Sequence, residues 1–145
     1  MKANAFAPLE REEGTDPLDV IDIIHDIVCP CENLIFTSQH RLDFCMRKLE
    51  KAKKLLPNLK ADDFHGMMIC HEAENMVLCT ELMLRAASMR KESRGWFQRE
   101  DYPETDNENW LKWICIKKGE NGEMEMYTED IPIETYPFQL PVEEE

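Results

Sequence analysis

One long helical pattern at residues 62–93 constrains this chain more than any other feature, because its apolar side chains fall on two faces. The first stripe contains Phe64, Met68, His71, Asn75, Leu78, Leu82 and Met89, and the second contains Ile69, Ala73, Met76, Met83 and Ala87. A helix that is apolar on two faces is packed from two sides. We therefore predict a central helix that two shorter helices cover on one side. For the other side two arrangements stay open: a missing neighbour, or residues 107–145 folded back onto it.

Two shorter helical patterns come first in the chain. Asp16-Pro17 is typical of an N-cap followed by the first helical residue. Ser38 or Thr37 caps the second helix, whose apolar seam is Leu42, Cys45, Leu49, Ala52 and Leu56. Residues 1–14 are expected to be an extended lead-in. The predicted fold class is mainly α: an antiparallel, spectrin-repeat-like three-helix bundle.

The last segment changes its period from helical to alternating. Asn121-Gly122 is a strong turn signal between two alternating runs, which predicts a β-hairpin at about 111–128. Prolines at 132, 137 and 141 and the final run of glutamates predict an extended acidic tail. The expected division is a helical bundle at 1–106 and a hairpin with its tail at 107–145.

The net charge of −13 is distributed unevenly. Residues 1–34 carry −6 and residues 100–145 carry −11, whereas residues 35–99 carry +4. An acidic chain repels phosphate backbones, so nucleic acid is not an expected partner. The basic centre either docks an acidic partner or pairs internally. No apolar run approaches the ~20 residues of a membrane span, and the N-terminus lacks a signal peptide, so a cytoplasmic location is expected.

A search for catalytic chemistry finds no motif. There is no Gly-x-Gly-x-x-Gly turn, no phosphate-binding glycine-lysine loop and no His-Glu-x-x-His pair. The pair Cys29 and Cys31 has C-x-C spacing, which is not that of zinc or redox motifs, and the helical cysteines (Cys45, Cys70, Cys79) are expected to act as small buried hydrophobes. We therefore predict no catalytic, cofactor-binding or metal-binding residue in this chain.

His71 and Asn75 lie one turn apart on the first stripe of the long helix. Such a pair forms a hydrogen-bonded polar layer inside a bundle more often than it reaches a ligand. The polar layer is therefore the favoured prediction.

The long helix ends in a dense charged segment at residues 90–103. Three arginines and three acids fall within twelve residues, beside two aromatic side chains and a glycine; they are Arg90, Arg94, Arg99, Glu92, Glu100, Asp101, Trp96, Phe97 and Gly95. A solvated helix end needs only a glycine at the position after the cap. The segment therefore indicates a chain reversal that is pinned against another surface.

This segment resembles the C-terminal domain of FAD-dependent flavoprotein subunits of the succinate dehydrogenase and fumarate reductase group, with adenylylsulfate reductase and L-aspartate oxidase as relatives. The matching motifs are Arg90-Lys91-Glu92-Ser93-Arg94-Gly95, Arg99, Asp101-Tyr102-Pro103, Asp106-Asn107-Glu108-Asn109-Trp110, Phe6-Ala7-Pro8-Leu9-Glu10-Arg11, Glu74-Asn75-Met76 and Leu84-Arg85-Ala86-Ala87. The resemblance covers most of residues 5–113. Phe97 departs from it, since many members carry histidine there.

The resemblance implies that FAD lies on a separate dinucleotide-binding domain or subunit. The matched region is then a helical bundle that braces the flavin domain and contributes to the surface met by an iron–sulfur electron-transfer subunit. Its signature positions are Glu92, Ser93, Arg94, Gly95 and Arg99, joined by Trp96, Phe97 and Asp101 as interface and structural residues. The expected function is a C-terminal domain or small subunit of a FAD-dependent oxidoreductase without a complete active site. The alternative is a free-standing acidic helical adaptor that binds a protein partner without redox function.

Overall fold

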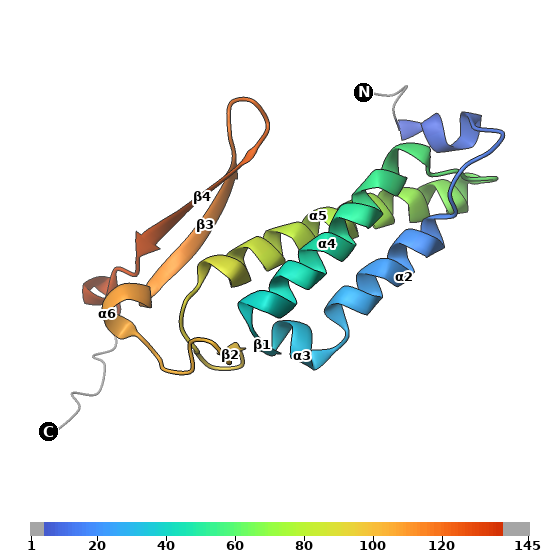
Figure 1. The fold of residues 1–145 in the computed structure, drawn as a ribbon. Helices are drawn as coiled ribbons and strands as arrows, with labels where there is room; N and C mark the ends of the chain where they lie inside the picture. The colour runs from blue at the N-terminus through green and yellow to red at the C-terminus, as the bar shows by residue number, and fades with distance from the viewer. Residues whose placement is uncertain (1–4, 138–145) are drawn as a thin grey trace, which may run out of the picture. The chain divides into compact units, whose positions relative to one another are not determined.

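A computed structural model describes residues 5–137 of the chain. It is mainly helical with one small β-hairpin, and it divides into two compact units, Met1–Thr105 and Asp106–Glu145. Figure 1 shows the helices of the first unit and the strands of the second. The mainly α class and the hairpin agree with the sequence prediction.

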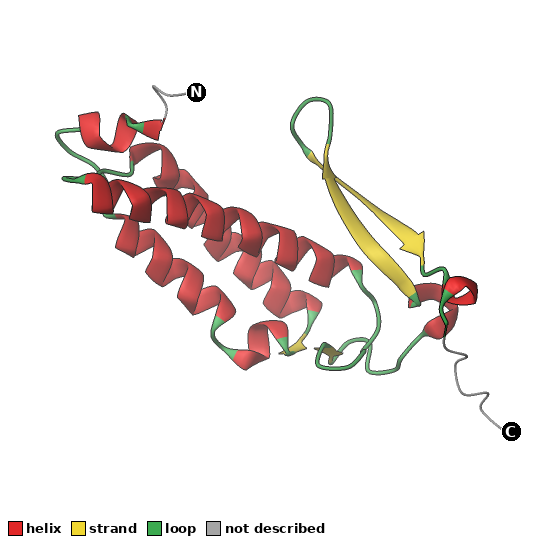
Figure 2. Ribbon diagram, turned by 180° about the vertical axis from the view of Figure 1, so that it is seen from behind, coloured by secondary structure: helices red, strands yellow, loops and turns green. Residues whose placement is uncertain are grey.

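Three long helices form the first unit: α2 (Pro17–Val28), α4 (Gln39–Leu55) and α5 (Phe64–Met89). Each of the three contacts the other two, and Figures 1 and 2 show α2 and α4 running side by side against α5. Their shared core consists of apolar side chains that are almost fully buried; among them are Val20, Ile24, Ile27, Leu42, Cys45, Leu49, Ala52, Cys70, Ala73, Val77 and Leu84. Four residues of the seam predicted for the second helix (Leu42, Cys45, Leu49, Ala52) are thus in the core, whereas Leu56 lies after α4 and is partly buried against it.

Of the three long helices, α2 and α5 are capped at their start by a neighbouring side chain, and α4 is not. The Asp16 carboxylate accepts the Leu18 N–H at the start of α2, and Pro17 is the first helical residue as predicted. Asp63 accepts the Gly66 N–H at the start of α5. Ser38 occupies the N-cap position of α4, but its side chain makes no cap bond. Side chains that satisfy the free N–H groups at a helix start stabilise it, so α4 needs another acceptor.

The central helix α5 buries one face and exposes the other. Its buried apolar residues are Cys70, Ala73, Val77 and Leu84, which follow one another at intervals of three, four and seven residues and so form one line along the helix. The first predicted stripe lies opposite this line, with Phe64 70%, Met68 54% and Leu78 48% exposed. The prediction of which side chains face the core was therefore largely wrong. Ala73 of the second stripe is buried, whereas Cys70, Val77 and Leu84 belong to neither predicted stripe.

The long helix is shorter than predicted at its C-terminal end. It stops at Met89, where the sequence pattern continued to residue 93, and Arg90 has extended backbone dihedrals (φ −75°, ψ 120°). Glu92 and Ser93, which the prediction placed on the helix, are buried in the loop that follows.

Short elements fill the connections of the first unit. They are the 3₁₀ helix η1 (Ala7–Glu10), the helix α3 (Cys31–Leu34), the strand β1 (Phe36–Thr37), the 3₁₀ helix η2 (Leu56–Asn58) and the strand β2 (Gln98–Arg99). Strands β1 and β2 pair in parallel. The lead-in predicted as extended is therefore a 3₁₀ turn at Ala7–Glu10, with Pro8 buried inside it.

The second unit begins with the short helix α6 (Asn107–Trp110), followed by β3 (Lys112–Lys118) and β4 (Met124–Asp130). The strands are antiparallel, in register from Lys112 opposite Asp130 to Lys118 opposite Met124. Gly122 turns the chain with φ 89°, as the Asn-Gly signal predicted. The tail was predicted to be extended, but it forms a 3₁₀ turn, η3 (Ile133–Thr135). Residues 138–145, with the final glutamates, lie outside the described residues.

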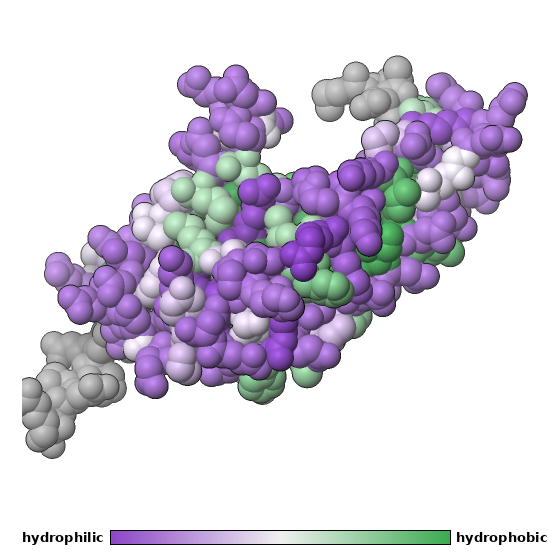
Figure 3. Space-filling model, viewed as in Figure 1, coloured by the Kyte–Doolittle hydropathy of each residue, from purple (hydrophilic) through white to green (hydrophobic). Residues whose placement is uncertain are grey.

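Three of the cysteine predictions can be compared with the structure. Cys45 and Cys70 are buried as expected, whereas Cys79 is exposed because it lies on the outer face of α5. Burial raises the pKa of the Cys45 and Cys70 thiols, so both are held as neutral thiols. Figure 3 shows that hydrophilic side chains cover most of the surface on the side of α2 and α4.

Candidate functional site

The chain leaves α5 through a buried carboxylate. The Glu92 side chain is fully buried and accepts two hydrogen bonds from the Arg94 guanidinium, at 2.8 and 2.9 Å. Arg90 donates to the same carboxylate, through Oε1. A buried charge is tolerated only when it is paired and hydrogen-bonded. Glu92 therefore fixes both arginines on the segment that follows the helix.

Arg99 is the second buried charge of the segment, and its residue is only 1% exposed. Its Nε and Nη2 donate to the two oxygens of Asp101 at 2.7 and 2.6 Å. Its Nη1 donates to the carbonyls of Ala87 and Arg90 at 2.9 and 3.1 Å. These carbonyls belong to the C-terminal end of α5, which lacks intrahelical donors. Arg99 thus caps α5 and also places a positive charge at the negative end of its dipole.

Asp101 supplies the cap that α4 lacks. Its Oδ2 accepts the N–H of Gln39, the first residue of α4, at 3.0 Å. The hydrogen bonds from Arg99, together with that N–H, lower the pKa of Asp101 to about 2. A side chain from the charged segment thus joins the C-terminal end of α5 to the N-terminal end of α4.

Ser93 organises the backbone of the same turn. Its Oγ accepts the N–H of Arg99 at 2.8 Å and donates to the carbonyl of Tyr102 at 2.9 Å. Its own N–H donates to the Glu104 carbonyl, and its carbonyl accepts the Thr105 hydroxyl. Only a short hydroxyl side chain that can both donate and accept serves this position.

Gly95 reverses the chain direction at the tip of the segment. Arg94 and Phe97 exchange both backbone hydrogen bonds, which leaves Gly95 and Trp96 as a two-residue turn. Gly95 has φ 58°, and among the described residues only glycines have a positive φ. A positive φ at the first central position alone is the type II′ hairpin turn, which favours glycine there.

The two aromatic residues of this turn differ in exposure. Trp96 is 86% exposed, and Phe97 is half-buried. The eight predicted signature residues therefore come together in one turn. Their charges are used within the chain, and Trp96 is the large apolar side chain that the turn presents outward. Phe97 was predicted as a second apolar anchor beside it and is partly covered.

Parallel pairing of β1 and β2 ties the turn to the start of α4. The N–H of Gln98 donates to the Ile35 carbonyl at 2.7 Å, and the N–H of Glu100 donates to the Thr37 carbonyl at 2.8 Å. The Thr37 hydroxyl is buried, and among the described side chains it is the one buried polar atom without a hydrogen-bond partner. Sequence reasoning predicted Thr37 only as a possible cap and did not find its role in this pairing.

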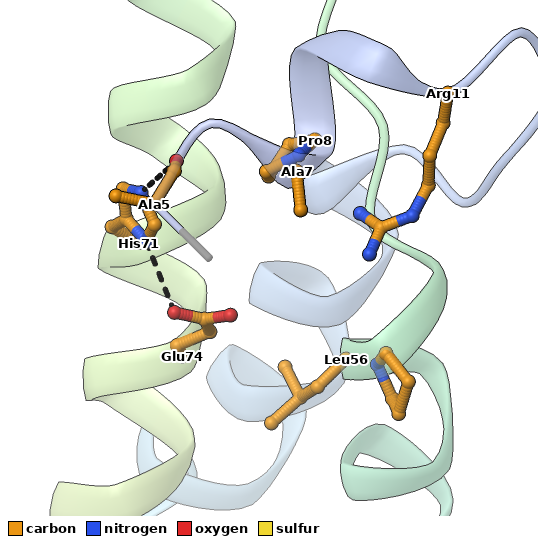
Figure 4. A pocket seen from close by; sticks show the side chains of 8 residues that line it. Ala5, Ala7, Pro8, Arg11, Leu56, His71 and Glu74 are labelled. Carbon is orange, nitrogen blue, oxygen red and sulfur yellow. Dashed lines mark hydrogen bonds and ion pairs between the residues drawn. The ribbon is translucent and has the colours of Figure 1, made fainter. Parts of the chain in front are cut away.

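A second candidate site is a cavity of about 360 Å³ at the opposite end of the bundle. Figure 4 shows His71 and Glu74 of α5 on one side, and Arg11 and Pro8 from the N-terminal segment on the other. His71 Nδ1 lies 3.1 Å from Glu74 Oε2, and His71 Nε2 lies 2.9 Å from the Ala5 carbonyl. Because both ring nitrogens face acceptors, the protonated imidazole is favoured and the pKa of His71 is raised, chiefly by Glu74.

The polar layer predicted for His71 and Asn75 is not present. Both residues lie on the outer face of α5, where Asn75 is exposed and His71 is half-buried under the N-terminal segment. The sequence indicates this cavity only indirectly, through the Phe6–Arg11 segment that carries part of the family pattern. Arg11 in fact donates to the Leu59 carbonyl and so fastens that segment to the loop after α4.

Within residues 5–137, no three His, Cys, Asp or Glu side chains are grouped closely enough to hold a metal ion. Over the same residues, none of the helices has the length and apolarity needed to cross a bilayer. The first site is a turn fixed by internal ion pairs, with the aromatic side chains of Trp96 and Tyr102 exposed.

Comparison with known proteins assigns most of the chain, including the charged turn, to a family. A family model described as the fumarate reductase flavoprotein C-term matches residues 32–144. An uncharacterized FAD-dependent oxidoreductase of Methanocaldococcus jannaschii is 34% identical over 83 residues, which are 57% of this chain and 15% of the relative. A fumarate reductase (CoM/CoB) subunit of Methanothermobacter marburgensis is 29% identical over 112 residues, which are 74% of this chain and 20% of the relative. The chain thus spans a fifth or less of the length of these curated relatives.

Solved structures have the same fold. Adenylylsulfate reductase from Archaeoglobus fulgidus superposes with a TM-score of 0.78 at 24% identity, over 90% of this chain and 24% of that one. A variant of E. coli quinol fumarate reductase FrdA superposes with a TM-score of 0.77 at 20% identity, over 94% of this chain and 24% of that one. At these identities the likeness shows the fold alone.

Proposed function

The chain belongs to the fumarate reductase flavoprotein C-terminal family, and on that premise we propose that it braces the FAD-bearing domain or subunit of an oxidoreductase. In this proposal FAD and the substrate are held by the partner, and this chain is not catalytic alone. It also contributes to the surface that an iron–sulfur electron-transfer subunit meets. The flavoprotein family and the name of the FAD-dependent relative from Methanocaldococcus jannaschii support the flavin partner.

The exposed apolar face of α5 is the observation that carries the proposal. Phe64, Met68 and Leu78 recur at helical spacing on the face opposite the core, and each is about half exposed or more. Leu82, which is half-buried, continues this face toward the charged turn. A row of large apolar side chains along a whole helix is typical of a surface that another protein covers.

The turn at residues 90–105 has a structural part in this proposal. Glu92, Arg94, Arg99 and Asp101 fix the loop by internal ion pairs, so the loop loses little further conformational entropy when a partner binds. Trp96 then supplies an aromatic anchor of the type enriched at interface centres. The eight signature residues thus form a rigid support for one exposed contact.

Affinity capture of the tagged chain from its source cells, with and without substitutions on α5, tests the proposal. The expected result is a co-purified protein that carries a dinucleotide-binding fingerprint and has the absorbance spectrum of oxidised flavin. Met68→Glu with Leu78→Glu abolishes this capture, because two carboxylates are then desolvated at the interface. Since both positions are exposed, the free chain keeps its stability to within about 0.5 kcal/mol.

Met68→Leu with Leu78→Met is the matched control, because it keeps the face apolar at the same two positions. This control retains the flavin-bearing partner. A partner without flavin that is lost in the glutamate variant would overturn the redox assignment and support the acidic adaptor. Capture of the flavoprotein by the glutamate variant at full yield would overturn the role of α5.

A further inference from the structure

Helices α2 and α4 carry two rows of opposite charge on the side of the bundle away from the apolar face of α5. The acidic row is Asp19, Asp22 and Asp26 on α2, and the basic row is Arg47, Lys51 and Lys54 on α4. Spacings of three and four place each row along one side of its helix. In both rows the side chains are exposed. Figure 3 shows the hydrophilic character of this surface.

The charges of the rows are mostly not used within the chain. Asp26 reaches Lys48, beside the basic row, at 3.4 Å. Among the described residues, Asp19, Asp22, Lys51 and Lys54 take part in no salt bridge. The rows therefore lie next to each other and meet only along the line between the two helices, with outward charges available to a partner.

The two rows are matched in length and in level. Seven residues separate the first and last member of each row, which is about 10 Å of helix. The helices run in opposite directions: Thr15 pairs with Leu59 at one end, and Asp26 with Lys48 further along. Asp19 is thus level with the Lys54 end of α4, and Asp26 is level with the Arg47 end.

From this pattern we propose that the surface formed by α2 and α4 binds a second copy of this chain. A two-fold axis parallel to both helices exchanges the places of α2 and α4 and keeps every residue at its level. The acidic row of one copy then faces the basic row of the other, twice over, as an isologous interface requires. A two-fold axis across the helices is excluded, because it sets like charges against each other.

Two exposed apolar side chains supply contact area at the borders of the same surface. Leu18, at the start of α2, is 52% exposed, and Phe44 on α4 is 45% exposed. Arg47 of the basic row and Lys48 beside it lie over the Phe44 ring at 5.9 and 5.3 Å, so the aromatic side chain lies next to the Arg47 end of the row. A nucleic acid or an anionic membrane fits this surface poorly, because the acidic row lies within it and repels a polyanion.

Sedimentation velocity of the full chain at about 0.1 M ionic strength tests the proposal. At this ionic strength the Debye length is ~10 Å, so repulsion between distant charges of the two copies is screened, whereas ion pairs in direct contact are not. The wild-type chain of 17.1 kDa is expected to form a dimer in rapid exchange with the monomer. Lys51→Glu with Lys54→Glu, and separately Asp19→Lys with Asp22→Lys, each raise the dimer dissociation constant at least about tenfold, because attraction becomes repulsion at both symmetric contacts.

Mixing the two reversed variants distinguishes this arrangement from any other. Each variant repels itself, but the acidic α4 of one faces the basic α2 of the other, so the mixture is expected to recover the dimer. Lys117→Glu with Lys118→Glu, which makes the same charge change on β3, leaves the dimer unaffected. A wild-type chain that stays monomeric, reversed variants that dimerise as wild type, or a mixture that stays monomeric would each overturn the proposal.

This surface is separate from the one proposed to meet the flavin partner. The glutamate substitutions at Met68 and Leu78 are therefore expected to leave the dimer intact. Conversely, the charge-reversed chains are expected to capture the flavoprotein. The two proposals can fail independently of each other.

Discussion

At the scale of single residues, Arg99 carries more of the structure than any other side chain of the signature turn. Its guanidinium holds a carboxylate and two helix-end carbonyls while it is almost fully buried. A lysine keeps the charge but offers no planar fork, so it cannot bond to all of these acceptors. Arg99→Lys is therefore expected to lower the free energy of unfolding by about 3 kcal/mol or more, as when a buried pair is broken.

Urea denaturation followed by circular dichroism measures this change. Arg41→Lys is the matched control, because Arg41 pairs with Glu100 at 2.8 Å but both side chains are partly exposed. The control is expected to cost about 1 kcal/mol or less. Equal losses in the two variants would contradict the special role of Arg99.

Asp101 gives the same turn an acid-sensitive component. Its pKa is about 2 in the folded chain, against an ordinary value of 3.8. A carboxyl whose folded pKa is lowered stabilises the fold fully above its ordinary pKa, and the stabilisation is lost as pH falls from about 4 through about 2. Because the side chain is partly exposed, screening reduces the contribution to about 1 kcal/mol.

Unfolding free energies measured from neutral pH down to pH about 2 test this, with Asp101→Asn as the comparison. The asparagine variant is expected to be less stable at neutral pH, and the difference from wild type is expected to shrink as the medium becomes acidic. A difference that stays constant across this range would show that the charge of Asp101 is not what stabilises the turn.

At the scale of elements, the sequence predicts helices and the hairpin well because their signals are local. Asp16-Pro17 starts α2 and Asn121-Gly122 turns the hairpin, as capping and turn chemistry require. The end of α5 was misplaced because Glu92 and Ser93 have partners, Arg94 and Tyr102, that no helical period reveals. The cap of α4 comes from Asp101, 62 residues away from Gln39, and a contact of that range has no local signature.

The N-terminal segment shows the same limit, since its fold depends on a histidine of another element. His71 of α5 holds the carbonyl of Ala5, and Glu74 raises the pKa of His71 above its ordinary 6.5. A group whose folded pKa is raised stabilises its contact fully below the ordinary pKa, and the stabilisation is lost as pH rises through the folded value. Residues 5–11 are therefore expected to be held more firmly at acidic than at basic pH.

Hydrogen exchange of the peptide that contains η1, corrected for the intrinsic effect of pH, measures this attachment. Protection is expected to fall as pH rises above about 6.5. Glu74→Gln moves the fall to lower pH, because the main cause of the raised pKa is removed. His65→Gln serves as control, since His65 is exposed on the same helix. Protection independent of pH in the wild-type chain would contradict the role of His71.

At the scale of the whole molecule, the two units differ in what holds them together. The first unit has a core of fully buried side chains, whereas none of residues 106–137 is buried. An isolated two-stranded hairpin is only marginally stable in water. The bundle, together with the turn closed by Glu104 and Thr105, is thus expected to fold without the hairpin.

A chain of residues 1–105 tests this independence by thermal unfolding. It is expected to unfold cooperatively within about 4 °C of the full chain, the shift that ~1 kcal/mol produces in a domain of this size. The complementary chain of residues 106–145 is expected to show no cooperative transition. A chain that ends at residue 92 is the control. It lacks Arg94, Arg99 and Asp101, so the buried carboxylate of Glu92 loses its ion pair with Arg94. If the 1–105 chain were as unstable as that control, the hairpin would be an integral part of the core, and the signature turn would not suffice to close the bundle.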